Sequence, residues 1–485
     1  NLNLNICYNV AGMFKPSPRK TDMNRQNNMW LTRGLSALIV LVSALWGMLP
    51  TAPGAHQKLA LLPVERAAQA AGSGITAVAA GDAHTCAIKS GALYCWGGNW
   101  YGQLGDGTTT SRSTPVAVTN MGSGVTAVAT GAYHTCAIKS GALYCWGRNT
   151  AGQLGDGTKT DRSTPVAVTN MGSDVTAVAA GWGHTCAIKS GTLYCWGDNW
   201  AGQLGASTSQ TCTISSFVFL CSTLPLAVTD MSSGLAAIVA GDNHTCAIKN
   251  GALYCWGANG YAQLGVDHLS IEASQTPVVV TNMDIGVTAV AAGAYHTCAI
   301  KSGALYCWGY NYYKQLGAPS GECLVGYYEP IPEPCSDTPL AVTNMDIGVT
   351  AVAAGRHHTC AIKSGALYCW GMNSADQLGA SSSQTCGGFD TPCSDTPLAV
   401  TDMDIGVTAV AAGRHHTCAI KSEALYCWGL NSNGQLGDGT TTNRSAPVQV
   451  LFSLSPFEKA APGDGDIGLP TALVLRWGSS SGADH

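Results

Sequence analysis

The sequence of 485 residues contains few charged side chains. Lys, Arg, Asp and Glu make up 11% of the chain and give a formal net charge of −5, whereas about 25% is usual for a soluble domain. A chain with so few basic residues does not neutralise a row of phosphates, which excludes a polybasic nucleic-acid-binding protein. Hydrophobic residues make up 46%, so charge repulsion does not keep the chain unfolded and we expect a large buried core.

The chain also lacks sustained 3.6-residue periodicity between residues 75 and 450, which argues against a helical solenoid. One unit recurs seven times instead. The string HTCAIKSGALYCWG, or a close variant, begins at His84, His134, His184, His244, His296, His358 and His416. Around it, four segments rich in β-branched, aromatic and small apolar residues predict four short strands per unit. Seven such units predict an all-β fold, a seven-bladed β-propeller of four-stranded antiparallel blades over residues 75–451.

Cysteine, by contrast, is abundant, with 21 residues. Ser90-Gly91 is a two-residue hairpin loop, and counting outward from it places Cys86 opposite Cys95. The pair falls at a non-hydrogen-bonded position, where Cα atoms lie about 4.5 Å apart, close enough for a disulfide. The same spacing recurs in every unit and predicts the disulfides Cys86–Cys95, Cys136–Cys145, Cys186–Cys195, Cys246–Cys255, Cys298–Cys307, Cys360–Cys369 and Cys418–Cys427.

Three of the units are longer and carry further cysteine pairs. We interpret these as inserted loops, each closed at its base by Cys212–Cys221, Cys323–Cys335 or Cys386–Cys393. Cys7 is left over. Ten disulfides belong in an oxidising compartment. A zinc site is the weaker alternative, because the units contain no C-x-x-C and offer one nearby histidine each, so we predict no metal and no other cofactor.

The longest apolar run, residues 35–49, supports export. Its 15 residues (LSALIVLVSALWGML) fit the hydrophobic region of a signal peptide better than a membrane span, which needs about 20. Residues 1–34 are then a non-native or basic leader, and 50–74 a linker. An uncleaved N-terminal anchor is the alternative, and both interpretations predict a secreted or cell-surface protein. After the repeats we expect a linker at 452–470 and, at 471–485, the start of a truncated β-sandwich similar to a fibronectin type III-like domain.

The pattern GxxHTCAIKSGALYCWGxNxxGQLG resembles the regulator of chromosome condensation repeat family, whose members form seven-bladed propellers. The resemblance covers about residues 75–450. The cysteine pairs depart from the eukaryotic nuclear pattern and are similar to exported bacterial versions. The founding eukaryotic members are guanine-nucleotide exchange factors for a nuclear GTPase, which an exported disulfide-rich chain does not meet. Other secreted relatives act by binding proteins, and in some cases the bound protein is an enzyme that they inhibit. Similarity of fold alone does not identify the partner of this chain.

Function is expected at the rim where strands 1–2 and 3–4 of each blade connect. The opposite rim barely varies, since Lys-Ser-Gly recurs in five units. The first rim varies strongly and is rich in Trp, Tyr and Arg, the residues that dominate protein interfaces. Drift at exposed turns is the alternative. The predicted partner-binding residues are Trp100, Tyr101, Tyr133, Trp182, Trp200, Tyr261, Tyr295, Tyr310, Tyr312, Tyr313, Arg356, His357, Arg414 and His415.

Several repeated residues have structural interpretations that compete with functional ones. The seven histidines are candidates for a metal ring, but buried polar groups need partners, so we expect each to satisfy backbone groups inside its own blade. The repeated tryptophans, Trp96 and its equivalents, are expected to pack in the core or between blades. Asp-Gly is first of all a turn, so calcium is the lesser interpretation for Asp106, Asp156 and Asp438.

One local positive cluster remains, formed by Arg356-His357 and Arg414-His415 in neighbouring blades. It is either a receptor for an acidic group of a partner or a solvated rim. The motif G-x-S-x-G at 478–482 lies in a serine-rich tail without a strand–elbow–helix context, so we predict no enzyme.

These features together predict an extracellular, non-catalytic binding or scaffold module. The partner is a protein or a surface polymer, with stacking on a sugar as a further option, and no nucleic acid is expected. The alternatives are a secreted enzyme inhibitor and a propeller lyase or hydrolase, followed by a guanine-nucleotide exchange factor.

Overall fold

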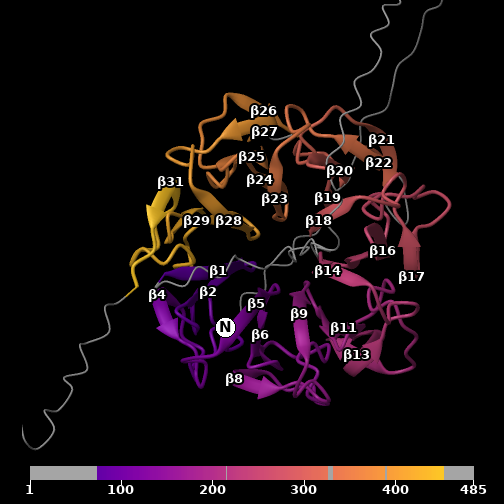
Figure 1. Ribbon diagram of the computed structural model, residues 1–485, viewed down its shortest axis with the longest axis vertical. Helices are drawn as coiled ribbons and strands as arrows, with labels where there is room; N and C mark the ends of the chain where they lie inside the picture. The colour runs from indigo at the N-terminus through magenta and orange to yellow at the C-terminus, as the bar shows by residue number, and fades with distance from the viewer. Residues whose placement is uncertain (1–73, 215, 326–330, 388–389, 453–485) are drawn as a thin grey trace, which may run out of the picture. The chain divides into compact units, whose positions relative to one another are not determined.

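The computed structural model describes residues 74–214, 216–325, 331–387 and 390–452. Within them, β-strands form seven antiparallel sheets arranged in a ring (Figure 1), which confirms the predicted seven-bladed β-propeller. The predicted leader, signal region, linkers and sandwich-like segment lie outside the described residues, apart from Gly74 and Phe452. No helix in the described part of the chain is long and apolar enough to cross a membrane.

Each blade is a meander whose first strand lies nearest the propeller axis. The first strands are β1 (Ile75–Ala80), β5 (Val125–Thr130), β9 (Val175–Ala180), β14 (Leu235–Ala240), β18 (Val287–Ala292), β23 (Val349–Ala354) and β28 (Val407–Ala412). The second strands are β2 (His84–Lys89), β6 (His134–Lys139), β10 (His184–Lys189), β15 (His244–Lys249), β19 (His296–Lys301), β24 (His358–Lys363) and β29 (His416–Lys421).

The third and fourth strands complete each blade toward its outer edge. The third strands are β3 (Ala92–Gly97), β7 (Ala142–Gly147), β11 (Thr192–Asp198), β16 (Ala252–Ala258), β20 (Ala304–Tyr310), β25 (Ala366–Met372) and β30 (Ala424–Gly429). The fourth strands are β4 (Arg112–Ala117), β8 (Arg162–Ala167), β13 (Phe217–Ala227), β17 (Ala273–Val279), β22 (Ile331–Ala341), β27 (Thr391–Ala399) and β31 (Arg444–Gln449). The fourth strands begin earlier than the segment PVAV predicts. In blade 1 the register between β3 and β4 shifts between Cys95 and Gly97, and Gly97 consequently pairs with Arg112.

The hairpin register is the predicted one in every blade. Cys86 pairs with Cys95 across β2 and β3, and the seven equivalent disulfides all have Cα–Cα distances of 4.1 Å. The turn that sets this register has positive φ at both central residues, 49° at Ser90 and 77° at Gly91, as the hairpin turn that matches strand twist requires. All fourteen cysteines are completely buried.

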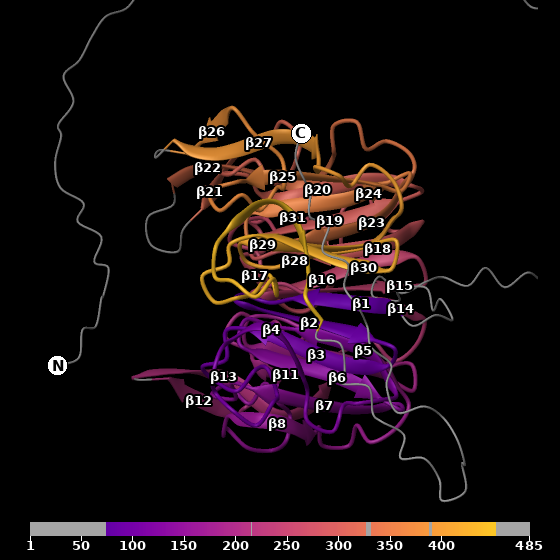
Figure 2. The same cartoon turned by 90° about the vertical axis from the view of Figure 1, so that its left-hand side faces the viewer.

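The three long repeats build hairpins on the outer edges of their blades. A fifth strand pairs there with the fourth: β12 (Thr211–Ile214), β21 (Gly321–Val325) or β26 (Gln384–Cys386). The predicted disulfides Cys212–Cys221, Cys323–Cys335 and Cys386–Cys393 are all formed, with Cα–Cα distances of 5.8, 5.6 and 5.9 Å. The hairpin of β12 and β13 projects clearly from the propeller in Figure 2.

A repeated hydrogen-bond ladder joins neighbouring blades. His84 Nε2 lies 2.9 Å from Oγ1 of Thr135 in the next blade, and the Thr135 hydroxyl donates to the carbonyl oxygen of Gln103 at 2.8 Å. The indole N–H of Trp146 donates to the same oxygen at 2.9 Å. The sequence predicts that each histidine satisfies backbone groups inside its own blade, and this prediction is wrong. The histidines bind the next blade, whereas the tryptophans pack between blades as predicted.

Every blade takes all of its strands from a single repeat. No described strand is therefore shared between the first and last blades, and the same hydrogen-bond ladder closes the ring. His416 Nε2 lies 2.9 Å from Thr85 Oγ1, and Trp96 Nε1 donates to the Gln435 carbonyl at 2.9 Å. Phe452, after the last strand, packs edge-on against Trp96 with ring centroids 5.9 Å apart. Closure thus depends on the interface between blades 1 and 7, without any strand exchanged between them.

Candidate binding face

The variable connections of all seven blades lie on one face of the propeller, which we call the variable face. The meander places the loops between first and second strands and between third and fourth strands at the same end of each blade. Loops from neighbouring blades meet there, because the 3–4 loop of one blade contacts the 1–2 loop of the next. Residues far apart in sequence thereby form two aromatic clusters.

The first aromatic cluster spans blades 1 to 3 and consists of Trp100, Tyr101, Tyr133, Arg148 and Trp182. Tyr133 packs against both Trp100 and Tyr101, with ring centroids 6.5 and 5.4 Å apart. The Arg148 guanidinium lies 5.4 to 5.8 Å from the ring centres of Tyr101, Tyr133 and Trp182. This cation–π arrangement presents a positive group framed by aromatic faces. Trp100 is 51% exposed.

The second aromatic cluster spans blades 4 to 6 and consists of Tyr261, Tyr295, Tyr310, Tyr312, Tyr313, Arg356 and His357. Tyr261 packs against Tyr295 and Tyr310 with centroids 4.8 and 5.0 Å apart. Tyr313 packs against the His357 ring at 4.8 Å. The Arg356 guanidinium lies 5.9 Å from the centre of the Tyr295 ring. Most of these side chains are half-buried, so packing holds their rings in place while part of each surface faces solvent.

Trp200 lies on the variable face outside both clusters. Its indole N–H donates to Oδ1 of Asn243 at 3.1 Å, and the side chain is 44% exposed. Its backbone N–H donates to the Asp198 carboxylate at 3.0 Å. Burial raises the pKa of Asp198 to about 6, although hydrogen bonds from Trp200 and Asn199 act in the opposite direction.

A cavity of about 80 Å³ opens on the propeller axis, where the seven 1–2 loops converge. We call it the axial pocket. Its wall is formed by the ends of the first strands and by the repeated glycine that follows each strand. The next loop residue of each blade also lines it: Asp82, Ala132, Trp182, Asp242, Ala294, Arg356 and Arg414. Burial, and then the charge of Asp82, raise the pKa of Asp242 to about 6. The axial pocket therefore brings two acids, two arginines and one tryptophan together.

The pairs Arg356-His357 and Arg414-His415 are less positive than the sequence indicates. Burial, followed by the neighbouring guanidinium, lowers the pKa of His357 to about 2 and that of His415 to about 4, so both rings are neutral at pH 7. Arg414 forms an ion pair with Asp82 at 3.1 Å. Only Arg356 remains as a guanidinium without an ion pair among the described residues of this group. The positive charge expected from this cluster is therefore reduced to the guanidinium of Arg356 and the paired guanidinium of Arg414.

The three Asp-Gly aspartates act as turn residues. Asp106 Oδ1 accepts hydrogen bonds from the backbone and hydroxyl of Thr108, and Oδ2 binds Arg112 at 3.1 Å. Burial alone raises the pKa of Asp106, but the Thr108 and Arg112 contacts outweigh it and lower the pKa overall. Asp156 and Asp438 repeat this arrangement.

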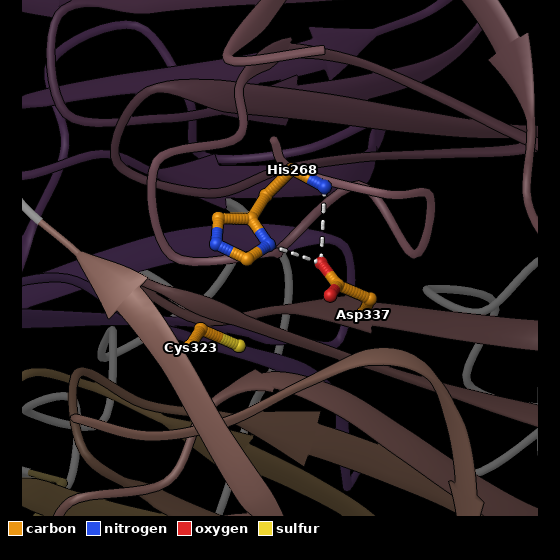
Figure 3. A group of neighbouring side chains, drawn as sticks. All are labelled: His268, Cys323 and Asp337. Carbon is orange, nitrogen blue, oxygen red and sulfur yellow. Dashed lines mark hydrogen bonds and ion pairs between the residues drawn. The ribbon is translucent and has the colours of Figure 1, made fainter. Parts of the chain in front are cut away.

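One group in the described residues has the composition of a metal site, namely His268, Cys323 and Asp337 (Figure 3). His268 Nδ1 lies 2.7 Å from the Asp337 carboxylate. Cys323 is bonded to Cys335, so its sulfur is not a thiolate and is a poor ligand for a transition metal. The group is better described as a hydrogen-bonded His268–Asp337 contact that connects the 3–4 loop of blade 4 to β22 of blade 5.

Three residues of the variable face escaped the sequence prediction. Arg148 follows the repeated Trp-Gly, where the other units carry Gly98, Asp198, Ala258, Tyr310, Met372 and Leu430. Comparing this column between repeats reveals a lone basic residue. Asp82 and Asp242 occupy a position that differs between the repeats. No sequence signal shows that they share a cavity with Arg356 and Arg414, because only closure of the seven blades into a ring brings these residues together.

Comparison with known proteins decides the family. Residues 46–394 match the RCC1-like domain, and residues 407–435 and 422–465 match the regulator of chromosome condensation (RCC1) repeat. The chain belongs to the RCC1 family. This confirms the resemblance derived from the repeats, whereas neither the exported bacterial type nor the fibronectin-like segment follows from these matches.

Among curated relatives of this RCC1 family chain, the ultraviolet-B receptor UVR8 of Arabidopsis thaliana is 32% identical over 44% of the chain and 46% of UVR8. The probable E3 ubiquitin-protein ligase HERC4 of Rattus norvegicus is 30% identical over 47% of the chain but only 20% of HERC4. The chain thus matches less than half of the length of either relative. Yeast RCC1 (Prp20), solved with Kap60 bound, has a TM-score of 0.61 at 21% identity, covering 74% of this chain and 83% of that one.

Proposed function

We propose that this RCC1 family chain is an extracellular, non-catalytic binding module that engages a partner protein through the variable face. The observation that carries the proposal is the convergence of two aromatic clusters on one face, each with an arginine held against the rings. Half-buried aromatics lose little side-chain entropy on binding, and Trp, Tyr and Arg contribute most to the binding energy of protein interfaces.

The solved structure of yeast RCC1 supports a protein partner over a surface polymer. Yeast RCC1 is bound to Kap60 in the solved complex, so a protein that contains a propeller of this fold has a protein partner. The ligase activity printed for HERC4 is not transferred, because the chain matches only a fifth of that protein. A surface polymer that stacks on the tyrosines is the second candidate, favoured by the exposed ring faces.

The disulfides support the extracellular setting. Ten are formed within the described residues, and a reducing cytosol does not maintain so many. A guanine-nucleotide exchange activity, which requires an intracellular GTPase, is therefore the least favoured reading of the family relationship. An enzyme inhibitor remains a special case of the proposed module, in which the partner is an enzyme.

The decisive experiment compares two triple variants of the full chain. One replaces Trp100, Trp200 and Tyr312 with Ala on the variable face. The matched control replaces Ile285, Ile347 and Ile405, which are 68 to 69% exposed on the links of the opposite face, with Ala. Immobilised protein is incubated with extracellular material from its native source, and captured proteins are identified by mass spectrometry.

We expect the wild type and the isoleucine variant to capture the same partner and the aromatic variant to lose at least about 90% of it, since losing three hot-spot residues weakens binding by far more than tenfold. Melting curves establish that both variants remain folded. Equal capture by the two variants would place the interface elsewhere, and loss only in the isoleucine variant would assign it to the opposite face.

A further inference from the structure

The axial pocket contains two opposite charges that the protein leaves without ionic partners. Asp82 and Arg414 neutralise each other across the boundary between blades 1 and 7. Asp242 in blade 4 makes no hydrogen bond or ion pair with any described residue. Arg356 in blade 6 uses Nε to donate to His357 at 3.2 Å, and its two terminal nitrogens bind no described acceptor. Both residues line the same cavity.

The separation of these two charges follows from the geometry of the ring. Asp242 and Arg356 belong to blades that are two steps apart, and blade 5 between them contributes only the small residue Ala294 at the equivalent position. Their charges do influence each other, since Arg356 acts to lower the pKa of Asp242. They are nevertheless not within the 4.0 Å of an ion pair. The gap between them is therefore lined by a carboxylate on one side, a guanidinium on the other and a small apolar side chain between.

A partly buried carboxylate without a positively charged partner lowers the stability of the folded state, because the charge loses water contacts that nothing replaces. Burial destabilises the charged form of Asp242, and the nearby Asp82 carboxylate adds to this effect. Such a group gains most from a cation that fits the cavity. The terminal nitrogens of Arg356 are placed to receive an anion, because a guanidinium binds a carboxylate through two parallel hydrogen bonds.

The size of the cavity limits the occupant. Drug-sized ligands need pockets of roughly 300–1,000 Å³, whereas this one measures about 80 Å³. It holds several water molecules or a ligand of a few heavy atoms. A ligand that satisfies both unpaired charges must carry an ammonium and a carboxylate within that small volume.

We propose that the axial pocket binds a small zwitterion of the amino-acid class, with its ammonium group on Asp242 and its carboxylate on Arg356. Trp182 lines the same cavity in the blade before Asp242, so the proposal places an aromatic ring beside the ammonium group. This site goes beyond the proposed protein-binding function, since it requires neither of the aromatic clusters to hold a partner.

The test is a calorimetric titration of the full chain at pH 7.5 with a series of amino acids that differ in the spacing of their charges. The probes are glycine, L-alanine, β-alanine, 4-aminobutyrate and 6-aminohexanoate, with methylammonium and acetate as single-charge probes. The variants are Asp242→Asn, Arg356→Gln and Arg356→Lys. Asp230→Asn is the matched control, because it makes the same change at an exposed position of a blade link on the opposite face.

We expect at least one zwitterion to bind saturably to the wild type and to Asp230→Asn. Binding should fall by at least about tenfold in Asp242→Asn and in Arg356→Gln, with a smaller loss in Arg356→Lys, which keeps the charge but not the fork. Methylammonium and acetate should each bind at least about tenfold more weakly than the zwitterion.

Three results would overturn the proposal. One is the absence of saturable binding for every zwitterion at concentrations up to about 10 mM, because a dissociation constant above that value corresponds to a very small binding free energy. Another is unchanged binding in Asp242→Asn. The third is methylammonium binding as tightly as the best zwitterion, which would make the pocket a simple cation site. Trp182 and Arg356 also belong to the aromatic clusters, but Asp242 does not, so Asp242→Asn tests the axial site without changing either cluster.

Discussion

His84 Nε2 donates a hydrogen bond to Thr135 Oγ1 across the boundary between blades 1 and 2, over 2.9 Å. The direction is determined by the threonine, whose single hydroxyl proton is already donated to the Gln103 carbonyl. The histidine must therefore carry its proton on Nε2. Burial lowers the pKa of His84 to about 3, so the ring is neutral and is a link in a ladder between blades.

Replacing one of the ladder threonines should weaken the propeller. Thr135→Val keeps the shape of the side chain but leaves the Nε2–H of His84 without an acceptor and removes one of the two donors to the Gln103 carbonyl. We expect a loss of about 2–3 kcal/mol, the usual cost of a buried donor left unpaired together with a lost hydrogen bond. Calorimetric melting should show a Tm lower by several degrees. Thr109→Val, the same substitution at an exposed loop position, serves as the control and should leave the Tm unchanged.

The glycines that line the axis should not tolerate even one methyl group. A Cβ on Gly131 would lie 2.6 Å from Nδ1 of His134 and closer still to the Gly181 carbonyl oxygen of the next blade. Gly131→Ala must push two blades apart, which we expect to cost more than about 3 kcal/mol or to prevent folding. Gly122→Ala, where a Cβ meets nothing within 4 Å, should be close to neutral. Similar melting temperatures for the two variants would contradict the close packing at the axis.

Acidification should destabilise the propeller from about pH 6.5 downward. Burial lowers the pKa of six ladder histidines to about 3 and that of His244 to about 4. In the unfolded chain these groups titrate near 6.5, so between that pH and the lowered pKa the unfolded state binds more protons. At pH 5 each contributes about 2 kcal/mol in favour of unfolding. Calorimetry from pH 7.5 to 4.5 should show a steep fall in Tm, and a constant Tm would show that the histidines are not buried as neutral rings.

Asp242 should have the opposite pH dependence. Its pKa in the folded protein is about 6, above its ordinary value of 3.8. Asp82, Arg356 and Arg414 are the charged groups that act on it. The folded state therefore gains protons, and relative stability, as the pH falls from 6 toward 4. Asp242→Asn removes the charge, so it should be more stable than the wild type by about 2–3 kcal/mol above pH 7, with the difference vanishing near pH 4.

Protein isolated from its native compartment should contain no free thiol among the twenty paired cysteines. Alkylation under denaturing, non-reducing conditions followed by mass spectrometry tests this directly. The hairpin cysteines Cys323 and Cys386 are 6% and 5% exposed, whereas the fourteen blade cysteines have no exposed surface. Mild reductant applied to the native protein should therefore open Cys323–Cys335 and Cys386–Cys393 first, whereas Cys212–Cys221, which is completely buried, should resist like the blade disulfides. Alkylation of most of the twenty cysteines would contradict the extracellular setting.

The repeated sequence was sufficient to predict the first three strands of each blade, the register of the hairpin between the second and third strands, and the disulfides. Cys86 opposite Cys95 follows from counting outward from a two-residue turn, because an antiparallel hairpin has only one register for a given turn. The fourth strands were predicted less well, since their start depends on the bulge opposite Trp96 and on the Asp106–Arg112 pair. The histidine bonds were predicted within single blades, an error that arose because a repeat considered alone has no neighbour.

By itself, the sequence determined how many blades there are, which cysteines pair and which loops share a face, since these properties depend on contacts within one repeat. Only the tertiary structure decided what lies between repeats: the His84–Thr135 ladder, the division of the rim aromatics into two clusters and the meeting of Asp242 with Arg356 at the axis. The physical reason is that ring closure brings together residues tens to hundreds of positions apart. Local periodicity carries no information about such contacts.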